Sequence, residues 1–154
     1  MKAEVRFDFS EIEKMNSDFL RAVPQATQAG FNQAAELTRG EMVKAIQRGP
    51  ATGRVYKKTN PIREHRASAP GEAPMSDTGD LARHATIDTK PPASVKRIND
   101  AEAKAGFPTG FDYADYLEYG TSKMAARPYV FPAFLKVQPH VMKLIRAAAK
   151  RALR

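Results

Sequence analysis

The sequence predicts an α+β fold, in which a small, mostly antiparallel sheet is packed by a long N-terminal helix and a C-terminal helix. A helical pattern from Gln25 to Arg48 and a second one that begins at Pro132 predict the two helices. Short stretches between them alternate apolar and polar residues, which is typical of strands. Because helices and strands do not alternate regularly along the chain, a parallel, doubly wound sheet is disfavoured.

The composition indicates one domain, spanning residues 1–154, with enough apolar residues for a core. The length of 154 residues is usual for a single domain, and 42% of the residues are hydrophobic. The absence of cysteine excludes disulfides and thiolate metal sites, and no apolar run reaches the roughly 18 residues of a membrane span. A net charge of +8 favours anionic partners such as DNA, RNA or an acidic protein surface.

The N-terminal part predicts a strand followed by a long helical region. Residues 4–9 alternate as in a half-buried strand, and their charges argue against a signal peptide. Ser10 and Glu13 form a capping box at the start of a helix. Pro24 then either kinks one long helix or begins a second one. The apolar stripe of the following helix comprises Phe31, Ala34, Ala35, Leu37, Thr38, Met42 and Ile46.

Glycines mark the end of this helix and one expected contact. Gly30 and Gly40 each cost the helix about 1 kcal/mol relative to alanine. Gly40 either simply weakens the helix or allows close packing against the sheet. The pair Gly49-Pro50 ends the helix.

Residues 50–76 predict a long, mobile, basic loop, because they are rich in proline, glycine, serine and threonine and poor in large apolar groups. One interpretation is a nucleic-acid-binding arm in which Tyr56 stacks on a base. The other is a segment that becomes ordered against a neighbouring subunit, and it is favoured because a single aromatic is a poor base platform. The basic side chains of the loop are Arg54, Lys57, Lys58, Arg63 and Arg66.

The middle of the chain predicts a short helix and several strands. The helix runs from Asp77 to about His84, and alternation at residues 85–89 predicts a strand after it. A turn at Lys90-Pro91-Pro92 precedes a second strand expected at residues 93–98. Alternating small residues at 101–107 predict a third strand that packs closely under a helix.

The stretch from Tyr113 to Ala133 predicts a short helix, a tight loop and the start of the C-terminal helix. Asp112 is the expected N-cap of the short helix, and Gly120 can adopt the backbone that ends it. Pro132 suits the first turn of the next helix, and Pro139 is expected to kink that helix. The C-terminal helix is basic. Its charged side chains form either a solvated polar face or a surface that contacts DNA or a partner ring. They are Lys136, Lys143, Arg146, Lys150, Arg151 and Arg154.

Two charges in this stretch predict a clamp. Glu118 lies in the last turn of a helix, where the helix dipole disfavours an anion, and Arg127 lies in the loop that returns past it. An arginine can hold a carboxylate through two hydrogen bonds, so a Glu118–Arg127 pair would fix the loop. The alternative is that both are unrelated surface charges, which contribute little to stability.

Two blocks of sequence carry a resemblance to a known family. The first block comprises residues 67–72, Pro74, 77–79 and Leu81, and the second comprises Tyr113, Ala114, Leu117, Glu118, Gly120, Thr121, Met124, residues 126–128, Pro132 and Ala133. In order and spacing these blocks resemble the tail-completion family of long-tailed phages and prophages, which are neck, or head–tail joining, proteins. The chain departs from the family pattern at Ala73, Tyr119 and Tyr129-Val130, where the replacements keep size and apolarity.

The resemblance implies a structural protein of the virion, made in the host cytoplasm, that joins or completes the tail at the head–tail interface. It further implies a ring of identical subunits that contacts other neck and tail proteins. Packaged DNA is a further candidate partner through the basic surfaces, and no membrane partner is expected. A head-to-tail interface would close such a ring. Candidate interface side chains, which could equally belong to the core, are Tyr116, Tyr119, Tyr129 and Phe131.

No catalytic constellation is evident, so the protein is expected to be neither an enzyme nor a cofactor-binding or metal-binding protein. The histidines at positions 65, 84 and 140 share no ligand spacing, and no catalytic or nucleotide-binding motif occurs. Asp112, Asp115 and Glu118 could share a helical face and bind a cation, although capping and solvent exposure are simpler roles. The alternative function is a basic nucleic-acid-binding module.

Overall fold

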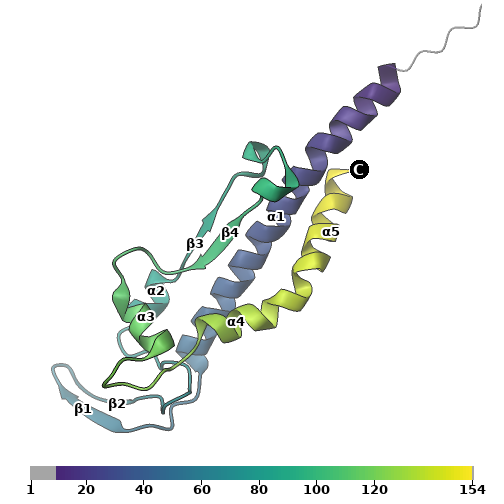
Figure 1. Cartoon of the computed structure of the whole chain (residues 1–154). Coiled ribbons are helices and arrows are strands. Elements are labelled where there is room, and N and C mark those ends of the chain that lie inside the picture. The colour runs from purple at the N-terminus through teal and green to yellow at the C-terminus, as the bar shows by residue number, and fades with distance from the viewer. Residues whose placement is uncertain (1–9, 154) are drawn as a thin grey trace, which may run out of the picture.

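The computed structural model describes residues 10–153, and the chain in this range folds into an elongated α+β molecule (Figure 1). The strand expected at residues 4–9 lies outside the described residues, as do the side chains of the expected capping box. Helix α1 (Ser10–Arg48) has 39 residues, so it is about 58 Å long at 1.5 Å per residue. Pro24 lies inside α1 without ending it, which leaves one long helix rather than two.

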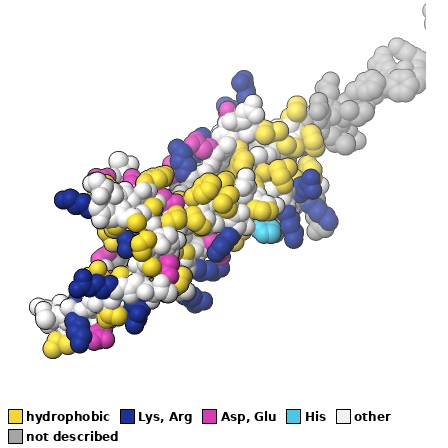
Figure 2. Space-filling view, turned by 60° about the horizontal axis from the view of Figure 1, so that its bottom comes forward, with side chains coloured by type: hydrophobic (Ala, Val, Ile, Leu, Met, Phe, Trp, Pro, Cys, Tyr) yellow, Lys and Arg dark blue, Asp and Glu magenta, His cyan; other side chains and the backbone are white. Residues whose placement is uncertain are grey.

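The C-terminal segment runs back along α1 as two helices. Helix α4 (Val130–Val137) leads through a single 3-10 turn, η3 (Gln138–His140), into α5 (Val141–Ala152). Pro139 lies in that turn, so the interruption expected at this proline is confirmed, and Pro132 occupies the first turn of α4 as expected. Figure 1 shows α5 beside the middle of α1, and Figure 2 shows hydrophobic side chains gathered along one face of the molecule.

The close approach between α1 and α5 occurs at Gly30. A Cβ built on Gly30 would lie 2.6 Å from Cγ1 and 2.7 Å from Cα of Ile145, nearer than side-chain carbons approach such atoms. Gly40, in contrast, has no atom of another part of the fold within 4 Å of such a Cβ. The interpretation that Gly40 permits close packing is therefore wrong. The close contact instead occurs where α5 crosses α1 at Gly30, because only a glycine leaves room there.

One antiparallel pair of strands, β3 (Thr86–Thr89) and β4 (Ala103–Gly106), lies along α1. The buried side chain of Gln28 fixes the start of β4, because its amide donates to the carbonyl of Glu102 (2.7 Å) and accepts from the same residue's N–H (2.9 Å). Residues 93–98 were expected to form a strand. They instead belong to a connection with two 3-10 turns, η1 (Pro92–Ser94) and η2 (Ile98–Asp100), because prolines initiate a turn there.

Residues 50–76 are not a structureless loop. They contain a β-hairpin of β1 (Val55–Thr59) and β2 (Ile62–Arg66), joined through a cis Asn60–Pro61 peptide. The strands pair only with each other, so the described part of the chain has two separate two-stranded sheets where one small sheet was expected. Sequence inspection missed the hairpin because both of its faces carry charged residues, which hides the apolar alternation of a half-buried strand.

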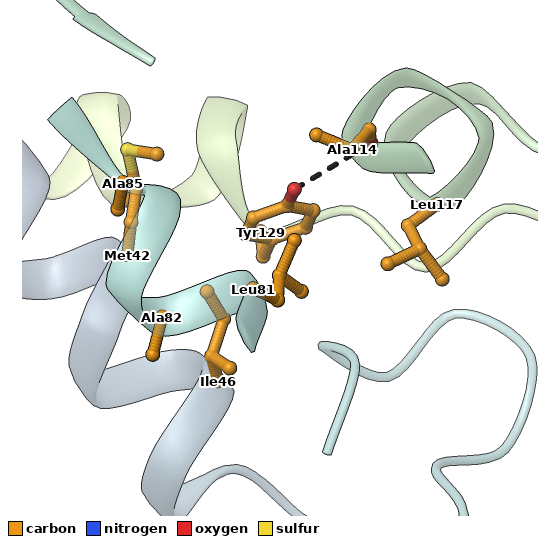
Figure 3. Close-up of a cluster of buried hydrophobic side chains, with 9 residues drawn as sticks. Met42, Ile46, Leu81, Ala82, Ala85, Ala114, Leu117 and Tyr129 are labelled. Atoms are coloured by element: carbon orange, nitrogen blue, oxygen red, sulfur yellow. Dashed lines mark hydrogen bonds between the residues drawn. The ribbon is translucent and has the colours of Figure 1, made fainter. Parts of the chain in front are cut away.

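The core forms where α1 meets two short helices, α2 (Asp80–His84) and α3 (Asp112–Tyr119), and the start of α4 (Figure 3). Asp112 was expected to cap α3, but it is the first helical residue, and Phe111 occupies the cap position without a side-chain hydrogen bond. No helix among the described residues is long and apolar enough to cross a membrane. The core cluster comprises Met42, Ile46, Leu81, Ala82, Ala85, Ala114, Leu117, Tyr129 and Ala133.

Candidate functional site

The buried carboxylate of Glu118 holds the start of α4. Oε2 of Glu118 accepts hydrogen bonds from the backbone N–H groups of Tyr129 (2.8 Å) and Val130 (2.9 Å), and Oε1 accepts from Phe131 (3.0 Å). These are N–H groups that a helix leaves without internal partners, and the helix dipole favours an anion at this end. Glu118 is only 9% exposed, so its charge is balanced by these three amides rather than by water.

The predicted Glu118–Arg127 clamp is therefore wrong in its pairing. The guanidinium of Arg127 instead donates to the carbonyl of Ser68, from Nε at 3.4 Å and from Nη2 at 3.3 Å. The backbone N–H of Arg127 donates to the carbonyl of Leu117 at 2.7 Å, so the loop does return past α3 as expected. Glu118 binds the amides because α4 begins only three residues beyond Arg127, at Val130, and its start offers several converging donors.

The loop between α3 and α4 depends on Gly120. Its φ of 77° is a backbone conformation that favours glycine, and an added Cβ would lie 2.8 Å from both the Ala126 nitrogen and the Met124 oxygen. Thr121 and Met124 then exchange two backbone hydrogen bonds of 2.8 and 3.2 Å. Gly120 thus ends α3, as expected, and lets the chain turn tightly enough to place Glu118 under α4.

The two sequence blocks that carry the family resemblance lie against each other. The N–H of Gly71 in the first block donates to the carbonyl of Ala126 in the second at 2.9 Å, beside the contact of Arg127 with Ser68. Leu81 and Leu117, one from each block, belong to the same core cluster. Residues that are far apart in the sequence thus build a single structural unit.

Glu72 fixes the chain that leads into the hairpin. Its carboxylate accepts from the Thr52 hydroxyl (2.5 Å) and from the backbone N–H groups of Ala69 (2.8 Å) and Thr52 (3.2 Å). These hydrogen bonds, with that of the Thr52 hydroxyl the largest, hold the pKa of Glu72 below its ordinary value. The base of the hairpin is therefore tied to the first block.

One face of the hairpin is anchored on Asp77. Lys58 forms a salt bridge with this carboxylate, Arg63 Nη2 lies 2.9 Å from it, and His65 Nδ1 lies 3.8 Å from it. The Lys58 hydrogen bond is the main reason that the pKa of Asp77 lies below its ordinary value, and the charge of Arg63 contributes to the same shift. Two of the five predicted loop cations thus have a structural role, and sequence inspection did not foresee Asp77 as their partner.

The remaining cations of the hairpin are more exposed. The Arg54 guanidinium lies 5.6 Å from the centre of the Tyr56 ring, and Lys57 Nζ lies 3.5 Å from Glu64 across the strands. Arg66 is exposed and forms no ion pair with the described residues. Tyr56 therefore already has an arginine beside it, which leaves it less suited to stack on a nucleic-acid base.

A groove opens between β4, α3 and α4, with α1 as its floor. Its volume is about 830 Å³, and it is open to solvent rather than enclosed. Asp112, Asp115 and Glu118 are its only charged residues among the described lining, so the groove is acidic in a protein with a net charge of +8. We call it the aromatic groove, after the lining side chains of Phe31, Phe107, Phe111, Tyr119, Phe131 and Phe134.

The four aromatic side chains proposed for an interface divide between core and surface. Tyr129 is 1% exposed and lies in the core (Figure 3). Burial is the main cause that raises the pKa of its phenol, and the charge of the Glu118 carboxylate is the second. Its hydroxyl donates to the carbonyl of Ala114 at 3.5 Å. Tyr119 and Phe131 are 80% and 60% exposed and line the aromatic groove, whereas Tyr116 is exposed outside its lining.

Asp112, Asp115 and Glu118 line the aromatic groove together but do not converge on a point that could hold a metal ion. Glu118 is occupied by the amides of α4, while Asp112 and Asp115 are exposed on α3. Among the side chains that the structure describes, no three histidine or acidic groups converge on a point that could hold a metal ion. His84 instead stacks on Phe111 with ring centres 4.4 Å apart, and His65 faces Asp77.

Comparisons of this chain with protein-family models, with curated proteins and with solved structures found no match. The two sequence blocks and the geometry of the chain itself are therefore the features that bear on its function.

Proposed function

We propose that this protein is a structural component of a long-tailed phage or prophage that joins or completes the tail at the head–tail interface. It would act as a homo-oligomeric ring and contact other neck and tail proteins. In this proposal it has no catalytic role, is made in the host cytoplasm and ends in the virion. Its partners are other neck and tail proteins, with packaged DNA as a candidate partner of its basic surfaces, and no membrane is involved.

The observation that carries the proposal is that the two blocks resembling the tail-completion family form one structural unit. Gly71 bonds to Ala126 across the blocks, and Arg127 bonds to Ser68. Motif residues that matched by chance would have no reason to meet in the fold. The internal roles of Glu118 and Gly120 give a physical reason for these residue types at these positions.

The surface of the subunit also supports assembly. A soluble monomer rarely leaves many large apolar side chains exposed over neighbouring elements, and such surfaces often mark protein contacts. Here they occur on α3, α4 and α5 and on the hairpin (Figure 2). The exposed set includes Tyr113, Tyr116, Tyr119, Phe131, Phe134, Leu135, Met142 and Ile62.

Deletion of the gene from a phage or prophage that carries it tests the proposal. Electron micrographs of the lysate should then show filled heads and separate tails, with few joined particles. Supplying the wild-type chain in trans should restore joining, and a chain with Glu118→Ala, which loses the capping of α4, should restore it poorly. Normal numbers of infectious particles from the deletion would overturn the proposal.

The basic charge of α5 favours a second candidate, a nucleic-acid-binding module. Its cations Lys143, Arg146, Lys150 and Arg151 have no acidic neighbour within the helix. A nucleic-acid binder should retain measurable affinity for DNA or RNA at physiological salt, with a steep dependence of the binding constant on salt concentration. Weak binding that disappears at physiological salt would instead fit a basic structural subunit.

A further inference from the structure

The β1–β2 hairpin has one face that this subunit leaves entirely unused. Cross-strand partners share a face, so Lys58, Arg63 and His65 lie together on the side that is held by Asp77. The opposite side, which we call the outer face, carries only exposed residues. They are Val55, Lys57, Thr59, Ile62, Glu64 and Arg66.

Ile62 is the most exposed large apolar side chain of this set. It is 91% exposed beside the turn of the hairpin, with Val55 also exposed at the other end of the same face. Burying an apolar side chain of this size stabilises a contact through the hydrophobic effect. Lys57 is paired with Glu64 on this face, whereas Arg66, which lies opposite Val55, forms no ion pair with the described residues, so the outer face combines apolar side chains with one net positive charge.

The aromatic groove has the complementary properties. Its walls and floor are mostly apolar, and Asp112 and Asp115 bring negative charge without any basic residue among the described lining. Oppositely charged surfaces speed association and exclude incorrect partners. An apolar, positively charged edge is therefore the kind of ligand that this groove fits.

We propose that the outer face of the hairpin of one subunit docks in the aromatic groove of a second copy of this chain. Ile62 enters the groove between α3 and α4, and Arg66 lies against Asp112 and Asp115. The inference deepens the proposed function, on which it rests, by naming the contact that would build the ring.

The subunit cannot satisfy its own groove in this way. The hairpin extends from one end of the molecule, below α3, whereas the groove lies between β4, α3 and α4 (Figure 1). The contact of Asp77 with Lys58 and Arg63 turns the outer face away from the rest of the fold. Hairpin and groove are thus two different surfaces, which gives the head-to-tail contact from which closed rings are made.

Disulfide cross-linking tests the contact directly, because the chain contains no cysteine. One otherwise wild-type chain carries Ile62→Cys and a second carries Phe134→Cys, and the two have tags of different size. The two chains are mixed and oxidised. The expected product is a cross-linked pair that contains one chain of each kind. The control, Ile98→Cys with Phe134→Cys, uses a residue that is also exposed but lies outside the hairpin and the groove, and it should cross-link at least tenfold less.

Charge reversal provides an independent measure. Arg66→Glu or Asp115→Lys alone should weaken self-association about tenfold in sedimentation or mass photometry, and the two together should restore much of it. Ile62→Asp should reduce association further while leaving the circular dichroism spectrum and melting temperature of the monomer unchanged. Equal cross-linking in the control pair, a lack of cross-linked product at any concentration, or unchanged association of Ile62→Asp would each overturn the contact.

The same variants separate this inference from the proposed function. If Ile62→Asp supplied in trans joins heads to tails as well as wild type, the hairpin contact is refuted and the tail role stands. If the deletion phage assembles normally while Ile62→Cys still cross-links to Phe134→Cys, the tail role is refuted and the contact between copies stands.

Discussion

Glu118 and Tyr129 are joined by a 2.8 Å hydrogen bond, in which the backbone N–H of Tyr129 donates to the Glu118 carboxylate. The same carboxylate accepts from Val130 and Phe131, so one buried side chain of α3 satisfies three amides at the start of α4. The junction of α3 and α4 therefore depends on a negative charge. Arg127, which does not pair with Glu118, makes a separate and smaller contribution to stability.

Glu118→Ala should therefore be much more destabilising than Arg127→Ala. Loss of the carboxylate leaves buried amides without partners, at an expected cost of about 2–3 kcal/mol in the free energy of unfolding. Arg127→Ala removes only long hydrogen bonds to one carbonyl and should cost about 1 kcal/mol. Urea unfolding of both variants measures the difference, with the exposed Glu36→Ala as a control that should change stability by less than about 0.5 kcal/mol. Equal losses for the first two variants would restore the direct Glu118–Arg127 pair.

Trypsin should cleave the free monomer first in the hairpin. The strands pair only with each other, and Arg54, Lys57 and Arg66 are exposed there. Asp77→Asn should increase the rate of this first cleavage several-fold, because Lys58 and Arg63 lose the charge that holds them. Asp88→Asn, an exposed aspartate in β3, is the matched control. A first cut within α1 would contradict the prediction, because it would show that α1 opens to the protease more readily than the hairpin.

The hairpin should also loosen in acid. The pKa of Asp77 is lower in the fold than in the unfolded chain, chiefly through the Lys58 hydrogen bond. The folded state therefore binds fewer protons, and the contact contributes fully above the unfolded pKa of about 3.9 and is lost as the pH falls through the lower folded value. Amide exchange of β1 and β2, corrected for the intrinsic rate, should rise below about pH 4. The same rise in Asp77→Asn would exclude Asp77 as the cause.

Gly30 and Gly40 offer the same substitution at two sites of one helix with opposite expected results. Gly40→Ala meets no neighbour and should stabilise the protein by about 0.5–1 kcal/mol through helix propensity. Gly30→Ala places its methyl group against Ile145, and overpacking of about 1–3 kcal/mol should exceed that gain. Thermal melts of the two variants decide the point. Stabilisation by both would mean that α5 can move away from α1 at little cost.

The helices and the core were predictable because their signals are local and periodic. Met42 and Ile46 recur at helical spacing, and Gly120 and Pro139 mark an end and an interruption that the fold confirms. These features need only the positions of apolar side chains, glycines and prolines along the chain. The fold class therefore followed from the sequence.

The contacts that position the candidate site were not predictable in the same way. Glu118 binds backbone amides, which every residue carries, so no residue type marks its partners. Gln28 bonds to Glu102 at a separation of 74 residues, and Asp77 joins Lys58 and Arg63 only once the hairpin exists. The hairpin itself is stabilised by charge pairs rather than by an apolar face, so the periodicity used to find strands gave no signal there.

Tyr129 and Phe131 should separate folding from assembly. The Tyr129 ring fills the core, so Tyr129→Ala should cost about 3–5 kcal/mol, whereas Tyr129→Phe keeps the ring and should cost about 1 kcal/mol or less. Phe131 contributes its backbone N–H to Glu118 but leaves its ring exposed over the aromatic groove, so Phe131→Ser should change monomer stability by less than about 0.5 kcal/mol.

The Phe131→Ser variant should nevertheless weaken self-association, because the groove loses part of the apolar wall that receives Ile62. Unfolding curves and sedimentation of the three variants measure the two effects side by side. A large loss of stability in Phe131→Ser, or unchanged association, would place its ring in the fold rather than at the contact between copies.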